Sequence, residues 1–260
     1  MAGAGRSATI ADMRQIAIFA ACASVVALAT GGCGVDLDAD EVHTARSFSF
    51  TGTELKIRSS LGGLRVLPGT GGAVVVERWV RGKAAGEGNA TWSLRDGTLR
   101  LGANCTMILG DCGARYHVKV PPGVRLSIDT VDGVILKDLT QDVDVSTREH
   151  IQVSGASGKL RLLSEGPITG ERLRSANVRC RTSDGAIKVT FDSPPTNLDL
   201  QSRDGRVTAT VPRDSYAVTT ASKEGEDRSE LKDTKSPRTI VARSTTGDVQ
   251  ILARGDRAGS

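Results

Sequence analysis

Aromatic side chains are scarce in this chain of 260 residues, in which phenylalanine, tryptophan and tyrosine together make up 3%. Glycine, in contrast, occurs 30 times, a high fraction for a globular domain. Few aromatic residues and many small residues favour thin, regular β-structure over the bulky core of a large globular enzyme.

Histidine is also rare, and His43, His117 and His150 do not stand at ligand spacing from one another or from a cysteine. The sequence holds neither a Gly-x-Ser-x-Gly nucleophile elbow nor a phosphate loop with Gly-Lys-Ser/Thr. We therefore expect no enzyme activity, no catalytic residues, no metal and no cofactor. A net charge of +4 is too small to indicate the concentrated basic face of a nucleic-acid-binding protein, so we expect no nucleic-acid partner.

The N-terminal apolar run, residues 16–29, is too short to cross a bilayer, which takes about 20 residues in a helix. Arg6 and Arg14 precede it and small residues follow it, as is typical of a secretory signal peptide. The sequence "LATGGC" resembles the end of a bacterial lipoprotein signal, in which cleavage occurs before a cysteine that is then lipidated. This resemblance implies lipidation at Cys33, although Thr30 stands where the pattern prefers leucine.

The N-terminus therefore predicts a signal peptide over residues 1–32 and a polar tether over residues 33–46. Acyl chains on Cys33 would hold the exported protein on the outer face of the cell membrane. Cys22 is a weaker candidate for lipidation, and the alternative is a plain secreted protein cut near the same place.

The remaining cysteines suit an oxidising compartment. Cys105 and Cys112 flank a short loop, and a disulfide between them would stabilise the fold by roughly 2–3 kcal/mol. A metal site is the alternative, but no second cysteine pair or histidine cluster completes one. Cys180 lies at an apolar position of a repeat, which predicts a buried and unreactive thiol.

That repeat dominates the sequence after residue 125. Short runs of alternating apolar residues end on a serine or threonine, and these hydroxyl residues are 17 to 24 positions apart. Alternate residues of a strand share one face, so the apolar residues form a face that one hairpin cannot bury alone. Stacked copies can bury it, and a period near 18 suits one coil of a β-solenoid with two or three strands. The hydroxyl residues are Thr130, Thr147, Ser164, Thr182, Ser202, Thr220 and Ser244.

A turn follows each hydroxyl residue and often contains Asp-Gly, as at Asp184-Gly185 and Asp204-Gly205. We expect the inward hydroxyl to bond the turn backbone or the adjacent coil, and the glycine to supply a positive φ. Residues 55–69 look like an earlier copy, so residues 47–125 are expected to be a β-rich section packed on the first coils. The charged residues 223–238 are expected to be a loop, and residues 253–260 a disordered tail.

Residues 47–252 are thus predicted to form a single-domain, all-β, solenoid-like stack of short strands. The units "TVDGVIL", "RTSDGAIKV", "SRDGRVTATVP" and "STTGDVQIL", with "VKVPPGVRLSIDT" before them, resemble a bacterial β-strand-repeat family known as "putative adhesins". The resemblance covers roughly residues 50–252 and implies the same stacked-strand fold. The coils within residues 143–170 depart from the pattern, because they replace the Asp-Gly turn.

The turn aspartates raise the one chemical alternative. Asp132, Glu149, Asp184 and Asp204 each stand two residues after a hydroxyl residue. Neighbouring coils lie about 4.8 Å apart, so stacking could align these acids into a ladder. Stacked carboxylates repel one another unless a cation or an arginine lies between them. The ladder could hold a cation or a ligand, but solvated turn aspartates are the simpler interpretation.

These observations predict a non-catalytic, membrane-anchored lipoprotein of the cell envelope that binds or scaffolds. Its expected partners are the membrane, through the N-terminal lipid, and cell-wall glycans or envelope proteins. A carbohydrate-active β-helix enzyme is one alternative, because stacked coils can align acids in a groove. An accessory protein of an envelope signalling system is the other.

Overall fold

The structure is a computed structural model that describes residues 40–105 and 111–255, all within one compact unit, Val35–Ser260. Apart from one 3-10 turn at Lys83–Ala85, its regular elements are β-strands, which confirms the all-β fold class. Within the described residues, no helix has the length and apolar character needed to span a membrane.

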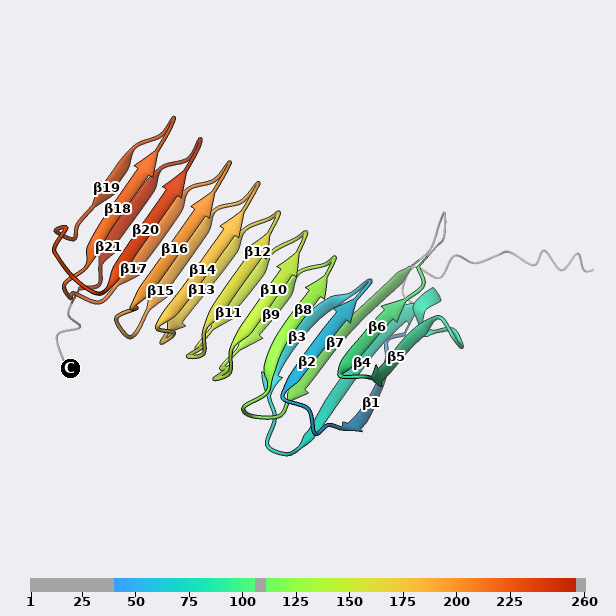
Figure 1. Ribbon diagram of the computed structural model, residues 1–260. Coiled ribbons are helices and arrows are strands. Elements are labelled where there is room, and N and C mark those ends of the chain that lie inside the picture. The colour runs from blue at the N-terminus through green and yellow to red at the C-terminus, as the bar shows by residue number, and fades with distance from the viewer. Residues whose placement is uncertain (1–39, 106–110, 256–260) are drawn as a thin grey trace, which may run out of the picture. The chain divides into compact units, whose positions relative to one another are not determined.

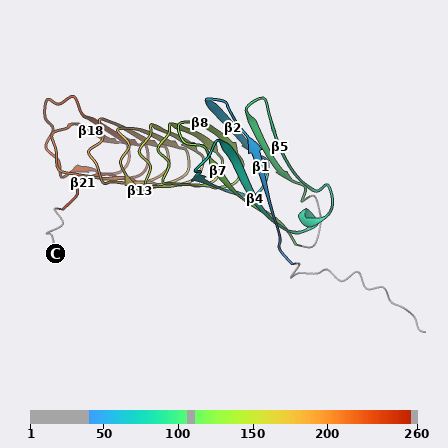
Figure 2. The same cartoon turned by 90° about the horizontal axis from the view of Figure 1, so that it is seen from below.

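The centre of the unit is a stack of two-stranded coils, with the first strand of each coil in one sheet and the second strand in another (Figures 1 and 2). Strands in these coils pair in parallel with their neighbours. The coils are β8 (Arg125–Thr130) with β9 (Val134–Lys137), β10 (Val143–Thr147) with β11 (Ile151–Ser154), β12 (Leu160–Ser164) with β13 (Ile168–Leu173), β14 (Asn177–Thr182) with β15 (Ile187–Phe191), and β16 (Asn197–Ser202) with β17 (Val207–Val211).

In the central coils the alternating sequence buries every second residue of a strand and leaves the residues between them on the outer face, as predicted. In β14, Val178, Cys180 and Thr182 are buried, whereas Arg179 and Arg181 are exposed. Cys180 lies opposite Leu162 and Leu200 on the adjacent strands. Each leucine-sized side chain removed from water contributes roughly 1.5–3 kcal/mol, so stacking stabilises coils that could not bury this face alone.

The predicted early copy is also present. It consists of β2 (Glu54–Ser59) and β3 (Gly63–Pro68), which pair in parallel with β8 and β9. Ile57 lies opposite Ile128 and Ser59 opposite Thr130, in the register that the sequence predicts.

The buried hydroxyl residues tie the coils together. In each of the following bonds the hydroxyl donates to a backbone carbonyl in the turn of the neighbouring coil, for a typical net gain of about 0.5–1.5 kcal/mol. The bonds are Thr147 to Asp132 (2.8 Å), Thr182 to Gly166 (2.6 Å), Ser202 to Gly185 (2.9 Å) and Ser244 to Gly205 (2.8 Å).

The expected reason for the turn glycines was wrong. Gly185, Gly205 and Gly247 are not among the residues with a positive φ. Glycine is needed instead because the stacked turns approach closely, and a Cβ on Gly205 would lie 2.1 Å from the carbonyl oxygen of Gly185. A side chain at these positions would therefore push neighbouring coils apart.

The N-terminal end of the stack is partly antiparallel. One sheet ends in the order β7, β4, β1 and the other in the order β2, β6, β5. β1 starts at Val42, within the segment expected to be a tether, because its residues pair along β4, with His43 opposite Trp79. The strands are β1 (Val42–Ser49), β4 (Ala73–Gly82), β5 (Ala90–Arg95), β6 (Thr98–Ala103) and β7 (Cys112–Val120).

At the C-terminal end the coils do not stack in chain order. The coil of β20 (Thr239–Ser244) and β21 (Val249–Ala253) lies between the β16/β17 coil and the coil of β18 (Ala217–Ser222) and β19 (Asp227–Ser229) (Figure 1). The predicted loop at residues 223–238 therefore contains a strand, β19. The predicted register of β18 was also wrong by two residues, because Ser222, not Thr220, pairs with Ser244.

The β20/β21 coil has apolar inward residues, such as Ile240 and Val249, which gain most from a position inside the stack. In that position both side chains are fully buried. The strand β21 also extends to Ala253, and the next residue, Arg254, donates a 2.6 Å hydrogen bond to the carbonyl of Phe191. The chain is thus still part of the fold where the tail was expected to begin, and residues 256–260 lie outside the described ranges.

Candidate functional site

A groove of about 520 Å³ runs across five successive coils, from β8 to β16. We call it the coil groove. Its walls come from the positions directly before and directly after the buried hydroxyl of each coil, so the repeat itself builds the groove. The residues used below are Asp129, Val131, Ser146, Arg148, Leu163, Glu165, Arg181, Ser183, Gln201 and Arg203.

Apolar side chains lie open to solvent in this groove. Leu163 is 47% exposed and Val131 is 42% exposed. Among the described residues only one other large apolar side chain, Val42, is exposed to this extent. Leu163 and Val131 both line the same hollow, where polar groups surround them and a bound ligand could contact them.

Two of the three arginines that line the groove, Arg148 and Arg181, are only weakly engaged by the rest of the fold. Within residues 40–105 and 111–255, Arg148 makes no ion pair. Arg181 is 3.8 Å from Asp199, which forms a closer ion pair of 2.9 Å with Arg179. Exposed ion pairs of this length contribute little to stability, so Arg181 could exchange Asp199 for another anion at small cost.

Two of the three predicted ladder aspartates meet at one arginine. The guanidinium of Arg203 donates to Asp184 (2.7 Å) and to Asp204 (3.0 Å). The pKa of Arg203 is raised by its bonds to Asp204 and to Asp184. An arginine therefore holds these carboxylates together, which is one of the two ways in which the sequence allowed them to stack.

Asp132 does not join this pair. Its carboxylate accepts a hydrogen bond from the backbone N–H of Gly62 on the preceding coil, and the coils in between carry Glu149 and Gly166 at the equivalent turn position. Within the part of the chain that the structure describes, no group of three or more His, Cys, Asp or Glu side chains is arranged to hold a metal ion.

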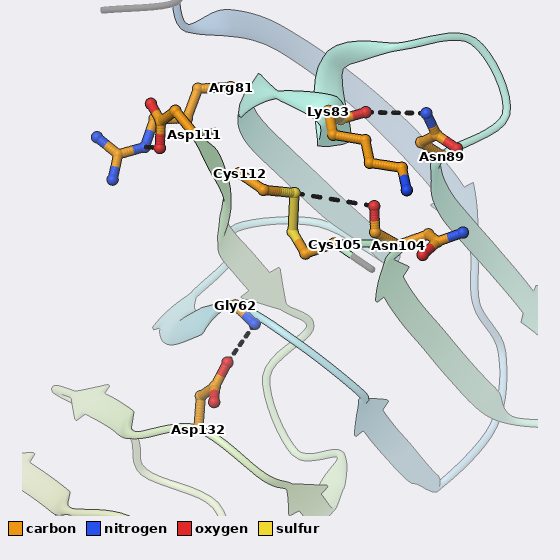
Figure 3. The surroundings of a disulfide bond; sticks show 9 residues. All are labelled: Gly62, Arg81, Lys83, Asn89, Asn104, Cys105, Asp111, Cys112 and Asp132. Carbon is orange, nitrogen blue, oxygen red and sulfur yellow. Dashed lines mark hydrogen bonds and ion pairs between the residues drawn. A yellow bond between two sulfur atoms is a disulfide. The ribbon is translucent and has the colours of Figure 1, made fainter. Parts of the chain in front are cut away.

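The predicted disulfide joins Cys105 and Cys112, whose Cα atoms are 5.6 Å apart. Figure 3 shows it beside the ion pair of Arg81 with Asp111 and the Gly62–Asp132 hydrogen bond. A hollow of about 430 Å³ lies along this region and is lined in part by Cys105, Cys112 and Asp132. Residues 106–110 are outside the described ranges. Cys33, the predicted lipidation site, also lies outside the described ranges.

An aromatic cluster lies on the eleven-stranded sheet at its N-terminal end. The ring of Trp79 stacks on His43 at 4.5 Å, and His117 lies tilted at the same distance. Arg115 is also placed over the indole, 5.0 Å from its centroid. We call these residues, with Glu77, the Trp79 cluster.

Charge and burial shift two groups in this cluster. The pKa of Glu77 is lowered, mainly by the hydrogen bond that it accepts from Lys119 at 3.0 Å. The pKa of His117 is lowered by burial and then by the nearby Arg65 and Arg115. A neutral imidazole is therefore favoured at this position.

Cys180 is the one free cysteine among the described residues, and it is fully buried between the sheets. Burial raises its pKa to about 12. A thiol that remains protonated and inaccessible has no use as a nucleophile or a ligand, in agreement with the role predicted from the repeat.

The groove residues Arg148, Leu163 and Arg203 were not singled out from the sequence. The repeat alignment holds a signal for them, because they fall directly before or after a hydroxyl residue in successive coils. The sequence gives no sign that this part of the sheet is hollow, since the depth depends on how the side chains of five coils pack.

No protein-family model and no curated protein match this chain. Solved structures similar to it include bacterial proteins described as "putative" adhesion proteins. One from Clostridium sporogenes is 11% identical and covers 83% of this chain and 100% of its own, with a TM-score of 0.37. Others come from Parabacteroides distasonis (11% identical, 82% and 98% covered, TM-score 0.41) and Bacteroides fragilis (13% identical, 81% and 97% covered, TM-score 0.34).

Proposed function

We propose that this chain is a non-catalytic binding protein of the bacterial cell envelope, exported and held on the membrane by a lipid on Cys33. In this proposal the coil groove holds an extended ligand across successive coils. The observation that carries the proposal is the groove itself, which spans five coils and is lined by two exposed apolar side chains, Val131 and Leu163, and two weakly engaged arginines, Arg148 and Arg181.

The state of the turn aspartates favours binding over the alternative of a carbohydrate-cleaving β-helix enzyme. Glycoside hydrolysis commonly needs two carboxyl groups that face the substrate, one of them protonated. Asp184 and Asp204 are instead bonded to the same guanidinium, that of Arg203. One oxygen of each carboxylate accepts from this guanidinium, which holds the two neighbouring turns together.

Two measurements test the proposal. Mass spectrometry of the mature protein should find an N-terminal acylated Cys33, and an unmodified N-terminus or an uncut chain would contradict the anchor. The soluble chain of residues 34–260 should co-sediment with purified cell-wall or membrane fractions without degrading their glycans. Glycan cleavage by the wild type that is lost in an Asp184→Asn, Asp204→Asn variant would instead support the enzyme.

A further inference from the structure

We propose that the coil groove binds a linear polysaccharide that carries acidic groups at intervals, with the sugar chain parallel to the axis of the stack. This inference rests on the proposed function and adds the class of ligand. Three properties of the groove lead to it: its spacing, its mixture of polar and apolar groups, and its pattern of charge.

The spacing of the groove suits a chain of sugar rings. Neighbouring strands are about 4.8 Å apart, so five coils make a groove on the order of 20 Å long in which similar positions recur at each coil. A pyranose ring is similar in size to this spacing, so each sugar can meet one coil. An extended polypeptide advances about 3.4 Å per residue and does not keep step with the coils.

The surface chemistry suits the two sides of a sugar. Ser146, Ser183 and Gln201 offer hydrogen-bond donors and acceptors that match sugar hydroxyl groups. Val131 and Leu163 offer exposed apolar surface on which the C–H face of a pyranose can pack. Carbohydrate sites commonly use aromatic rings for this contact, but branched aliphatic side chains can fill the role in a chain with few aromatics.

The charges favour acidic groups that are spaced along the ligand. Leu163 lies opposite Arg181 on one neighbouring strand and Ser146 on the other, and Arg148 follows two residues after Ser146. Arginine binds carboxylate or phosphate through two parallel hydrogen bonds. Asp129 and Glu165 lie in the same groove and would repel a polymer with an anion on every unit. A polysaccharide with an acid on only some sugars satisfies both conditions.

The experiment measures binding of the soluble chain of residues 34–260 by titration calorimetry. The first probe is hyaluronan oligosaccharide, in which every second sugar carries a carboxylate. Neutral chitin oligosaccharide, polyphosphate and poly-glutamate of similar length are the comparison probes. A phosphate-bearing polysaccharide distinguishes phosphate from carboxylate as the acidic group. We expect the acidic polysaccharides to bind at least about tenfold more tightly than each comparison probe.

The test variant is Arg148→Glu with Arg181→Glu, and both side chains are exposed, so the fold should tolerate the change. The matched control is Lys137→Glu with Lys188→Glu, the same charge change on exposed residues of the other sheet. We expect at least a tenfold loss of affinity in the test variant and less than a twofold change in the control. Equal losses in both variants would overturn the assignment to the groove.

Other results separate this inference from the proposed function. If the wild type co-sediments with envelope fractions but binds no acidic polysaccharide, or binds poly-glutamate or polyphosphate as well, the ligand class is wrong and the proposed function stands. If the wild type binds neither the probes nor any envelope fraction, the proposed function fails with it.

Discussion

At the N-terminal end of the stack, Arg78 of β4 lies over the ring of Trp92 on β5, whereas at the C-terminal end Thr220 of β18 hydrogen-bonds Asp227 of β19. The guanidinium carbon is 4.2 Å from the indole centroid, and the hydroxyl is 2.8 Å from the carboxylate. Both pairs join the two sheets where the apolar interior ends.

The apolar core is therefore closed in two different ways, by an aromatic ring at one end and by polar side chains at the other. At the N-terminal end, Trp92 packs on the core and the cation of Arg78 covers it, with hydrogen bonds to Ala90 and Thr44. At the C-terminal end, Thr220 and Asp227 pair with Ala242 and Val249 of the adjacent β20/β21 coil. Polar residues thus stand at the positions where the adjacent coil has apolar residues. Terminal repeats need a polar outer surface because another copy could otherwise stack on them.

The largest effect is expected at the aromatic end. Trp92→Ala should lower the free energy of unfolding by about 2–3 kcal/mol, less than for a fully buried tryptophan, because the ring is half-buried. Urea denaturation followed by circular dichroism measures this change. The comparison is Trp79→Ala, which removes an equally half-buried ring from the outer surface of β4. An equal loss there would show that Trp92 stabilises the fold only through its contact area and not by closing the core.

The polar end can be tested by making the β18/β19 coil resemble the adjacent β20/β21 coil. Thr220→Val with Asp227→Leu extends the apolar interior to the end of the stack. We expect self-association to strengthen by about tenfold, or roughly 1.4 kcal/mol. Light scattering coupled to size-exclusion chromatography measures it. Arg228→Leu, at an exposed position of the same short strand, is the control, and it should not reproduce the effect.

The open edge of β18 gives a smaller prediction. The backbone N–H of Val218 donates to the carboxylate of Asp233 at 3.0 Å, so this side chain occupies a group that could pair with another strand. Asp233→Ala should cost about 0.5–1 kcal/mol and increase aggregation on warming. Turbidity during a thermal ramp measures it, with Lys232→Ala as the control. A variant that stays as clear as the wild type would contradict a protective role.

The smallest expected difference between the two ends is in how their stability responds to acid. The folded state lowers the pKa of His117 below 6.5, so the unfolded chain binds more protons there and stability falls as the pH drops through 6.5. The lowered pKa of Glu77 adds a further loss as the pH drops through 4.5. Amide exchange in β4 and β7 should accelerate before that in β20 and β21. His117→Gln should remove the higher-pH step, and exchange that accelerates equally at both ends would contradict this prediction.

Much of the central stack could be predicted from the sequence because its evidence is local. Alternating apolar residues fix which face of a strand is buried, and the recurrent hydroxyl fixes the register, as for Cys180 between Leu162 and Leu200. The ends could not be predicted in this way. β1 was missed because its residues are mostly exposed and its pairing with β4 depends on residues about 30 positions away.

The candidate site was also only partly predictable from the sequence. Periodicity identified the positions of the turn aspartates, but it could not show that Arg203 would bond both Asp184 and Asp204. It also aligned Arg148 and Leu163 beside the hydroxyl column without indicating a groove. The hollow depends on side-chain packing across five coils, and no single repeat contains that information.

The sequence by itself determined the strand type, the two-faced alternation, the coil period and the buried column of hydroxyl residues, because each follows from contacts between equivalent positions of a repeat. Only the tertiary structure decided the order of the last two coils and the way each end is closed. The coil with Ile240 and Val249 buries more apolar surface inside the stack, whereas the coil with Thr220 and Asp227 can face water. The order depends on which of two coils gains more free energy from the inner position. A local sequence pattern does not contain this comparison.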